Sequence, residues 1–121
     1  MGVITQEMNK KRQLEITAEG YVKFIKLTKF DEPKVTHWQG KTIESTHRAS
    51  VLLEKEEDSQ WINLGEFKSQ RDNITFKVGD EWKELKQGQL VLIDIKKVGE
   101  YNGKPTYQSS KSNITILEEA P

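Results

Sequence analysis

Three groups of side chains in this sequence are of types that could carry out chemistry. His37 and His47 lie ten residues apart with no cysteine nearby, which is not the spacing of a structural metal site. The carboxylates of residues 56–58 adjoin a turn, where a run of charges is usually a solvated surface. The serines of 109–112 have no histidine or lysine arranged as an activating base. No phosphate-cradling glycine motif is present. We therefore expect no enzymatic activity, no metal and no cofactor.

Aromatic and basic side chains are the remaining candidates, and they suit binding rather than catalysis. Aromatic rings stack on the bases of a single strand, while lysine and arginine neutralise its phosphates. The ring of Trp38 either folds back over the core or stands out as a stacking platform. The candidate nucleic-acid-binding residues are Lys34, Trp38, Lys41, Arg48, Lys97, Tyr101, Lys104 and Tyr107.

Length and composition indicate one soluble intracellular domain. The chain has 121 residues, of which 34% are hydrophobic and 31% charged, enough for a single core. No apolar run approaches the length of a membrane span, and the N-terminus MGVITQEMNKKR has no apolar region typical of a secretory signal. The absence of cysteine agrees with a reducing compartment. We expect a cytoplasmic protein without membrane association.

The formal net charge of zero argues against a surface that is basic all over. The charges are unevenly distributed, because residues 1–50 carry nine basic against six acidic side chains, whereas residues 51–80 carry four against seven. Separate basic and acidic faces are therefore compatible with the sequence.

Alternating apolar residues predict a series of β-strands. Glycine inside a strand usually marks a bulge or bend, which we expect at Gly20 and Gly65. Tyr21 and Trp61 are expected in the core. The predicted strands cover residues 13–30, 47–55 and 61–67, with a further short strand at 74–78.

The C-terminal third predicts a buried strand followed by a hairpin. Leu90–Ile95 is apolar apart from Asp94 and reads as a strand covered on both faces. Asn102-Gly103 is a strong signal for a two-residue turn, which places Tyr101 opposite Lys104 and Val98 opposite Tyr107. The root of this hairpin is expected to enter the core through Ile93, Ile95, Ile114 and Ile116.

Three connecting segments complete the prediction. Asp31–Thr46 is expected to be a long functional loop, because Pro33 and Gly40 interrupt it. Asp80 is expected to cap a single helical turn whose Trp82 and Leu85 plug one mouth of a barrel. Residues 1–12, with Lys10-Lys11-Arg12, are expected to form a flexible arm, either a frayed terminus or a basic arm that contacts phosphates.

This order of strands and loops is that of a five-stranded Greek-key OB-fold barrel, with a short helical turn between strands three and four. The chain resembles OB-fold single-stranded DNA-binding proteins, particularly the small phage-encoded type, over a domain of residues 13–117 followed by a short tail, 118–121. The resemblance rests on strand order and loop placement. It implies a strand held on the face of strands two and three, between the loops 31–46 and 98–107.

The resemblance further implies a function in DNA replication or recombination, with single-stranded DNA and proteins of those processes as partners. The implied location is the cytoplasm, or the host cytoplasm if the protein is phage-encoded. The short tail lacks the acidic segment by which bacterial proteins of this type recruit partners. The alternative is a β-barrel protein-interaction or structural module, in which the same aromatic side chains are interface anchors. A small-ligand barrel is disfavoured, because side chains fill the interior of so small a barrel. Exposed strand edges allow a homodimer.

Overall fold

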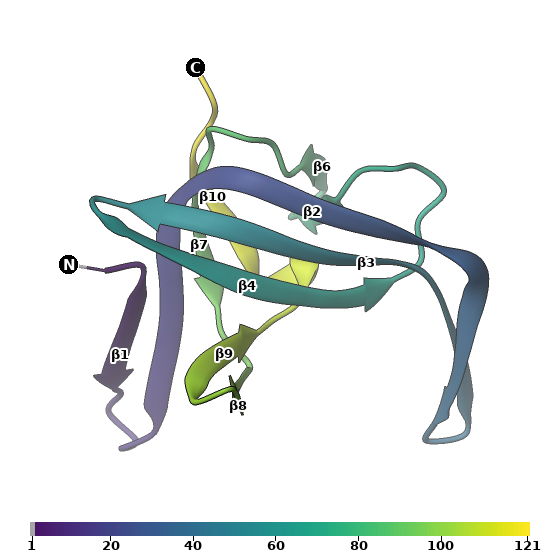
Figure 1. Cartoon of the computed structure of the whole chain (residues 1–121), viewed down its shortest axis with the longest axis horizontal. Coiled ribbons are helices and arrows are strands. Elements are labelled where there is room, and N and C mark those ends of the chain that lie inside the picture. The colour runs from purple at the N-terminus through teal and green to yellow at the C-terminus, as the bar shows by residue number, and fades with distance from the viewer. Residues whose placement is uncertain (1) are drawn as a thin grey trace.

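The computed structural model describes residues 2–121 and shows an all-β protein (Figure 1). No helix in this part of the chain has the length and apolar character that crossing a bilayer requires. The described strands, with one short 3₁₀ turn, are β1 (Ile4–Met8), β2 (Leu14–Trp38), β3 (Lys41–Lys55), β4 (Asp58–Phe67), β5 (Thr75–Val78), β6 (Glu81–Glu84), β7 (Leu90–Asp94), β8 (Lys97–Tyr101), β9 (Lys104–Gln108), η1 (Lys111–Asn113) and β10 (Ile114–Glu118).

One large sheet runs in the order β10–β7–β2–β3–β4–β9–β8, with β1 paired to the start of β2, while β5 and β6 form a separate two-stranded sheet. All pairs are antiparallel except β4 with β9, which is parallel. The hydrogen-bonded path ends at β10 and β8, so the sheet is not closed into a barrel. The described residues form ten strands rather than the expected five, although the prediction of an all-β protein is confirmed.

β9 and β10 follow one another in sequence but pair with different strands, β4 and β7. Between them, the Ser109 amide donates to the Asn63 carbonyl at 2.8 Å, and the Ser109 hydroxyl donates to the Asp94 carbonyl. The Asn113 side chain donates to the Ser109 hydroxyl at 3.3 Å. Serine and asparagine side chains compete in this way with regular ladder pairing. Regular strand pairing is therefore interrupted between β9 and β10.

The predicted loop 31–46 is instead a continuation of β2 and β3, and this prediction was wrong. Residues 34–38 pair with 41–45 and form a two-stranded arm, hereafter the arm (residues 34–45), which bends away from the main sheet at the right of Figure 1. The register shifts between Lys29 and Lys34, so Pro33 lies where it has no ladder partner. Gln39 and Gly40 form the turn with φ of 50° and 75°.

The N-terminal segment, expected as a flexible arm, takes part in the sheet. β1 pairs with the first residues of β2, from Ile4 opposite Ala18 to Met8 opposite Leu14. Val3 is fully buried, and its amide donates a 2.8 Å hydrogen bond to the carboxylate of Asp58. Burial of Val3 and this hydrogen bond attach the segment to the start of β4.

The hydrophobic core consists of the inward-facing side chains of the large sheet, with further contributions from β5 and from the segments that flank the β5–β6 hairpin. The alternation that predicted the strand over 47–55 is confirmed, because Ala49, Val51 and Leu53 are all buried on β3. The largest buried apolar side chains from the other segments are Val22, Ile62, Ile74, Phe76, Val91 and Ile93.

The predicted C-terminal hairpin is confirmed in its register. Tyr101 pairs with Lys104 and Val98 with Tyr107, and the turn residues Asn102 and Gly103 have φ of 51° and 77°. Positive φ at both positions is what a type I′ turn requires. At the root, Ile93 and Ile114 are buried, while Ile95 and Ile116 pack against the core.

The helical turn predicted from Asp80 is absent from the described chain, where β5 and β6 form a hairpin instead. Gly79, at φ 61°, opens its turn, and the four residues on each side pair antiparallel, from Val78 with Glu81 to Thr75 with Glu84. Trp82 points outward with 69% of its surface exposed, so it does not plug a barrel mouth. Leu85 is buried, as expected, and its amide donates to the Ile74 carbonyl at 2.9 Å.

Candidate nucleic-acid interface

Three cross-strand rows of side chains lie on the solvent side of β2, β3 and β4. Registered neighbours on adjacent strands share a face, so each row can be read directly from the pairing. The rows are Phe24, Leu52 and Trp61; Lys26, Ser50 and Asn63; and Thr28, Arg48 and Glu66. We call this surface the outer face.

The outer face continues onto the C-terminal hairpin. Asn63 on β4 is registered with Gln108 on β9, and Gln108 with Lys97 on β8. Since side chains alternate along a strand, Lys104 and Tyr101 at the far end of the hairpin belong to the same face. The outer face therefore spans five strands, β2–β3–β4–β9–β8.

Two adjoining depressions form a groove along this face. The first, of about 250 Å³, is lined by Lys26 and Arg48, and the second, of about 430 Å³, is lined by Trp61 and Tyr101. Both depressions include Ser50 and Asn63, so they form one groove. The groove places a basic end beside an aromatic end.

The aromatic rings of the outer face are accessible. Trp61 is 43% exposed and Tyr101 72%, and the sequence-based expectation that Trp61 and Tyr21 lie in the core was wrong for both. The Trp61 ring is held edge to face against Phe24, with centroids 6.1 Å apart. Alternation around the buried Ile62 was the signal that could have placed Trp61 outside.

The basic side chains of the outer face are available to bind phosphate. Within residues 2–121, no ion pair involves Lys26, Arg48, Lys97 or Lys104. One carboxylate, Glu100, also lines the groove. The positive charge of the groove is therefore modest.

The structure divides the predicted site residues into three sets. Arg48, Lys97, Tyr101 and Lys104 come together on the outer face. Three others, Lys34, Trp38 and Lys41, lie on the arm. The eighth, Tyr107, also lines the groove but is only 8% exposed, so its ring packs in the core and is not free to stack on a base. Sequence reasoning missed Phe24, Lys26, Trp61 and Asn63.

The arm carries Trp38 and Lys41 at its tip, whereas Lys34, at its base, contacts Glu66 of the outer face. Trp38, registered with Lys41, is 64% exposed at the arm tip, so it stands out rather than folding over the core. Lys34 is paired with Glu66 at 2.8 Å, which reduces its availability to a phosphate. Figure 1 shows the arm and the β8–β9 hairpin projecting toward the same side of the view, below the β3–β4 ribbon.

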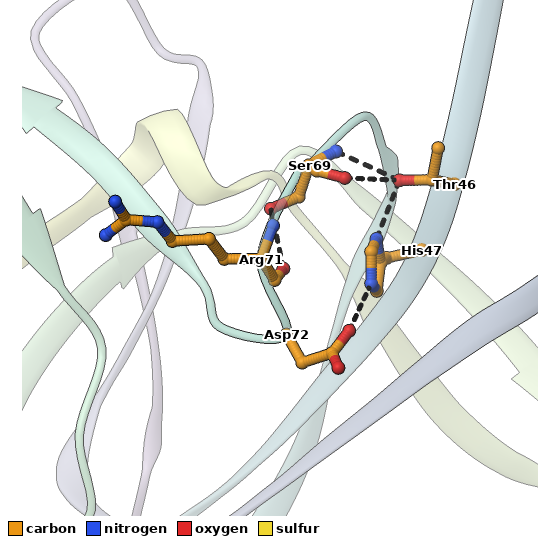
Figure 2. Close-up of polar contacts among 5 residues, drawn as sticks. All are labelled: Thr46, His47, Ser69, Arg71 and Asp72. Atoms are coloured by element: carbon orange, nitrogen blue, oxygen red, sulfur yellow. Dashed lines mark hydrogen bonds and ion pairs between the residues drawn. The ribbon is translucent and has the colours of Figure 1, made fainter.

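A polar cluster around His47 fixes the middle of β3, where the strand leaves the arm, to the segment after β4 (Figure 2). The buried imidazole lies 2.7 Å from the Thr46 hydroxyl and 3.1 Å from the Asp72 carboxylate, and it stacks on Phe67 with ring centroids 5.9 Å apart. The hydrogen bond from His47, followed by the charge of Lys29, lowers the pKa of Asp72. The cluster has a structural role, because it satisfies a buried polar ring.

The comparisons with known proteins identify no relative. The sequence matches no protein-family model, and no curated protein or solved structure is significantly similar to it. In the described part of the chain, no group of three or more histidine, aspartate or glutamate side chains is placed to hold a metal ion. The function is therefore argued from the outer face itself.

Proposed function

We propose that this protein binds single-stranded DNA along the groove of its outer face. The observation that carries the proposal is the combination, on one sheet surface, of accessible aromatic rings and basic side chains without carboxylate partners. In such a site, bases stack on Trp61 and Tyr101, and the phosphates are neutralised by the basic side chains of the face, Lys26, Arg48, Lys97 and Lys104. A duplex keeps its base faces stacked inside, so it cannot use the aromatic rings.

The strand pairing supports a relation to the OB-fold. β2 pairs with β3 on one edge and β7 on the other, and β4 pairs in parallel with β9. If β7–β8 and β9–β10 are each read as one interrupted strand, this is the arrangement of a partly open, five-stranded OB-fold. The OB-fold binds oligonucleotides on its second and third strands, which would be β3 and β4 here.

On this proposal the protein resembles small phage-encoded single-stranded DNA-binding proteins. Replication or recombination in the cytoplasm, or in the host cytoplasm for a phage protein, is then its proposed setting. Proteins of those processes are its proposed partners.

The test is a titration of tryptophan emission with oligo-dT, oligo-rU and duplex DNA. We expect oligo-dT to quench the emission at concentrations at which the duplex does not. The double variant Lys26→Gln, Arg48→Gln should weaken the oligo-dT complex, while the matched control Lys10→Gln, Lys11→Gln removes the same charge from the exposed N-terminal turn and should not. Equal weakening in both variants would refute a specific groove.

A second candidate function, protein interaction, is favoured by one observation on the arm. Trp38 and Ile43 are exposed large apolar side chains on the same face of this projecting hairpin, together with Lys41. Aromatic and apolar side chains of this kind serve as interface anchors. An unchanged emission with all three nucleic acids would place this function first.

A further inference from the structure

A second hollow, which we call the loop pocket, lies beyond the end of β4 and is separate from the outer-face groove. It has a volume of about 580 Å³, within the usual range for ligand sites, and lies between the segment 68–75, β6 and η1. Its basic residues are Lys68, Arg71 and Lys111, and Trp82 is its aromatic residue. None of the residues lining the loop pocket lines the groove.

The three cations of the loop pocket are poorly compensated by acidic side chains. No carboxylate lines the pocket. In Figure 2 the Arg71 guanidinium points away from Asp72 and His47. Lys68 forms only a long ion pair, with Glu44 at 3.9 Å. An anion entering the pocket would therefore meet positive charge.

Lys111 adds a reason for an anion to bind. Its ammonium group lies 4.6 Å from the centroid of the Phe67 ring, and no ion pair involving it is formed within residues 2–121. Partial burial lowers the pKa of Lys111. A cation that has lost part of its hydration without gaining a carboxylate is stabilised by an incoming phosphate.

Trp82 gives the pocket a second recognition element. The β5–β6 hairpin holds this residue, whose ring is largely exposed and forms no aromatic pair with another ring of the described chain. An exposed indole beside three cations matches a ligand that is planar at one end and anionic at the other.

The wall of the pocket is already ordered by hydrogen bonds that do not use the ligand-facing cations. The Ser69 hydroxyl donates to the Arg71 carbonyl at 2.8 Å, and the Ser69 amide donates to the Thr46 hydroxyl at 2.9 Å. The Asn73 side chain donates to Glu84 at 2.8 Å. Such preorganisation lowers the cost of binding.

We propose that the loop pocket binds a nucleotide, with the base against Trp82 and the phosphate between Lys68, Arg71 and Lys111. This inference is independent of the proposed function, because the two sites share no residue. The nucleotide is either a free mononucleotide or one unit of a bound strand. Both sources present the same chemistry to the pocket.

The test uses a background in which Trp82 is the only tryptophan, made by Trp38→Phe and Trp61→Phe. The titrants are dTMP, inorganic phosphate, thymidine and oligo-dT. We expect dTMP to quench Trp82 and to bind more tightly than phosphate or thymidine alone. Quenching by dTMP would identify the ligand as a free mononucleotide. Quenching by oligo-dT alone would identify it as one unit of a bound DNA strand, and either result supports the proposal.

Arg71→Gln in this background should raise the dissociation constant of the quenching ligand by about tenfold or more, the effect of losing one charged hydrogen bond. Lys10→Gln, the matched control, should leave it unchanged. Thermal melting checks that Arg71→Gln remains folded, which is expected because Arg71 is exposed and its hydrogen bonds to Ser69 use backbone atoms.

Three results would overturn the proposal: no response of Trp82 to any titrant, equal affinity for phosphate and dTMP, or equal weakening by Arg71→Gln and Lys10→Gln. Failure of the outer-face proposal is distinguishable, because Lys26→Gln, Arg48→Gln should weaken binding of oligo-dT at the groove and leave binding of dTMP at the loop pocket intact.

Discussion

Phe24 and Trp61 meet edge to face across β3, with their ring planes at 76° and Leu52 between them in register. An aromatic pair of this geometry contributes about 0.5–1.5 kcal/mol beyond the area that it buries. The contact holds the indole in place on an otherwise solvated surface. The Trp61 ring is therefore held in position without a bound ligand.

The position of the stacking platform can be tested by comparing Trp61→Ala with Trp38→Ala. We expect Trp61→Ala to remove most of the oligo-dT quenching and to weaken binding by about 1–3 kcal/mol, because it removes the ring on which a base stacks. Trp38→Ala, at the arm tip, should retain most of both. Fluorescence titration of the two variants provides the measurement, and the reverse order of effects would move the platform to the arm.

Salt dependence tests the electrostatic half of the proposed site. The slope of log K against log salt should be roughly −3, at about −0.7 per neutralised phosphate. This value assumes one phosphate contact for each of Lys26, Arg48, Lys97 and Lys104. Arg48→Gln should make the slope shallower by about 0.7. Titrations at several salt concentrations measure both values, with Lys10→Gln as the control. A slope near zero in the unmodified protein would contradict phosphate recognition.

The hairpin tip separates binding from stability. Tyr101→Ala, Lys104→Ala should weaken oligo-dT binding while changing the free energy of unfolding by no more than about 0.5 kcal/mol, because both side chains are exposed. Gly103→Val should instead destabilise the fold by about 1–3 kcal/mol, because a β-branched residue resists its φ of 77°. Nothing lies within 4 Å of the added Cβ, so the effect is conformational.

Thermal melting and affinity are to be measured on both tip variants. A double variant that melts and binds like the unmodified protein would show that the hairpin does not touch the strand, and would favour the protein-interaction function.

Acid stability is expected to depend on Asp72. Its pKa is lower in the folded state than its ordinary value of 3.8, so its stabilising contribution is complete above that value and is lost as the pH falls through the folded pKa. Asp72→Asn should therefore lower the melting temperature at pH 7, with a difference that shrinks toward pH 2. Melting curves across this range, with Asp80→Asn as the control, provide the test. A constant difference would contradict the linkage.

Local patterns predicted those parts of the fold that local chemistry determines. Alternation identified the buried face of β3, and the turn preference of Asn102-Gly103 gave the register of the C-terminal hairpin. The arm was mistaken for a loop because Pro33 and Gly40 look like strand breakers. In the structure, Pro33 occupies a register shift and Gly40 a tight turn, so neither prevents pairing.

The candidate site was predicted less completely, because it is assembled from strands distant in sequence. Arg48, Tyr101 and Lys104 were identified by residue type, but Trp61 was assigned to the core on hydrophobicity alone. Its exposure follows from the alternation around Ile62, and its partnership with Phe24 requires the β2–β3–β4 register. Tyr107 illustrates the opposite error, because it was assigned to the site by residue type although the predicted hairpin register places it on the opposite face from Lys104.

The parallel β4–β9 pairing consists of two registered pairs, Ile62 with Tyr107 and Asn63 with Gln108, whereas β2 and β3 are paired over much of their length. The β8–β9 hairpin, which carries Tyr101, is thus joined to β4 by a short ladder. Weakly anchored units of this kind open locally more readily than the rest of a fold. Backbone amides of residues 98–106 should exchange with solvent faster than those of 49–53. If the protein binds single-stranded DNA as proposed, a DNA strand held by both Trp61 and Tyr101 would slow that exchange, and opening of the hairpin would limit the rate at which the DNA dissociates.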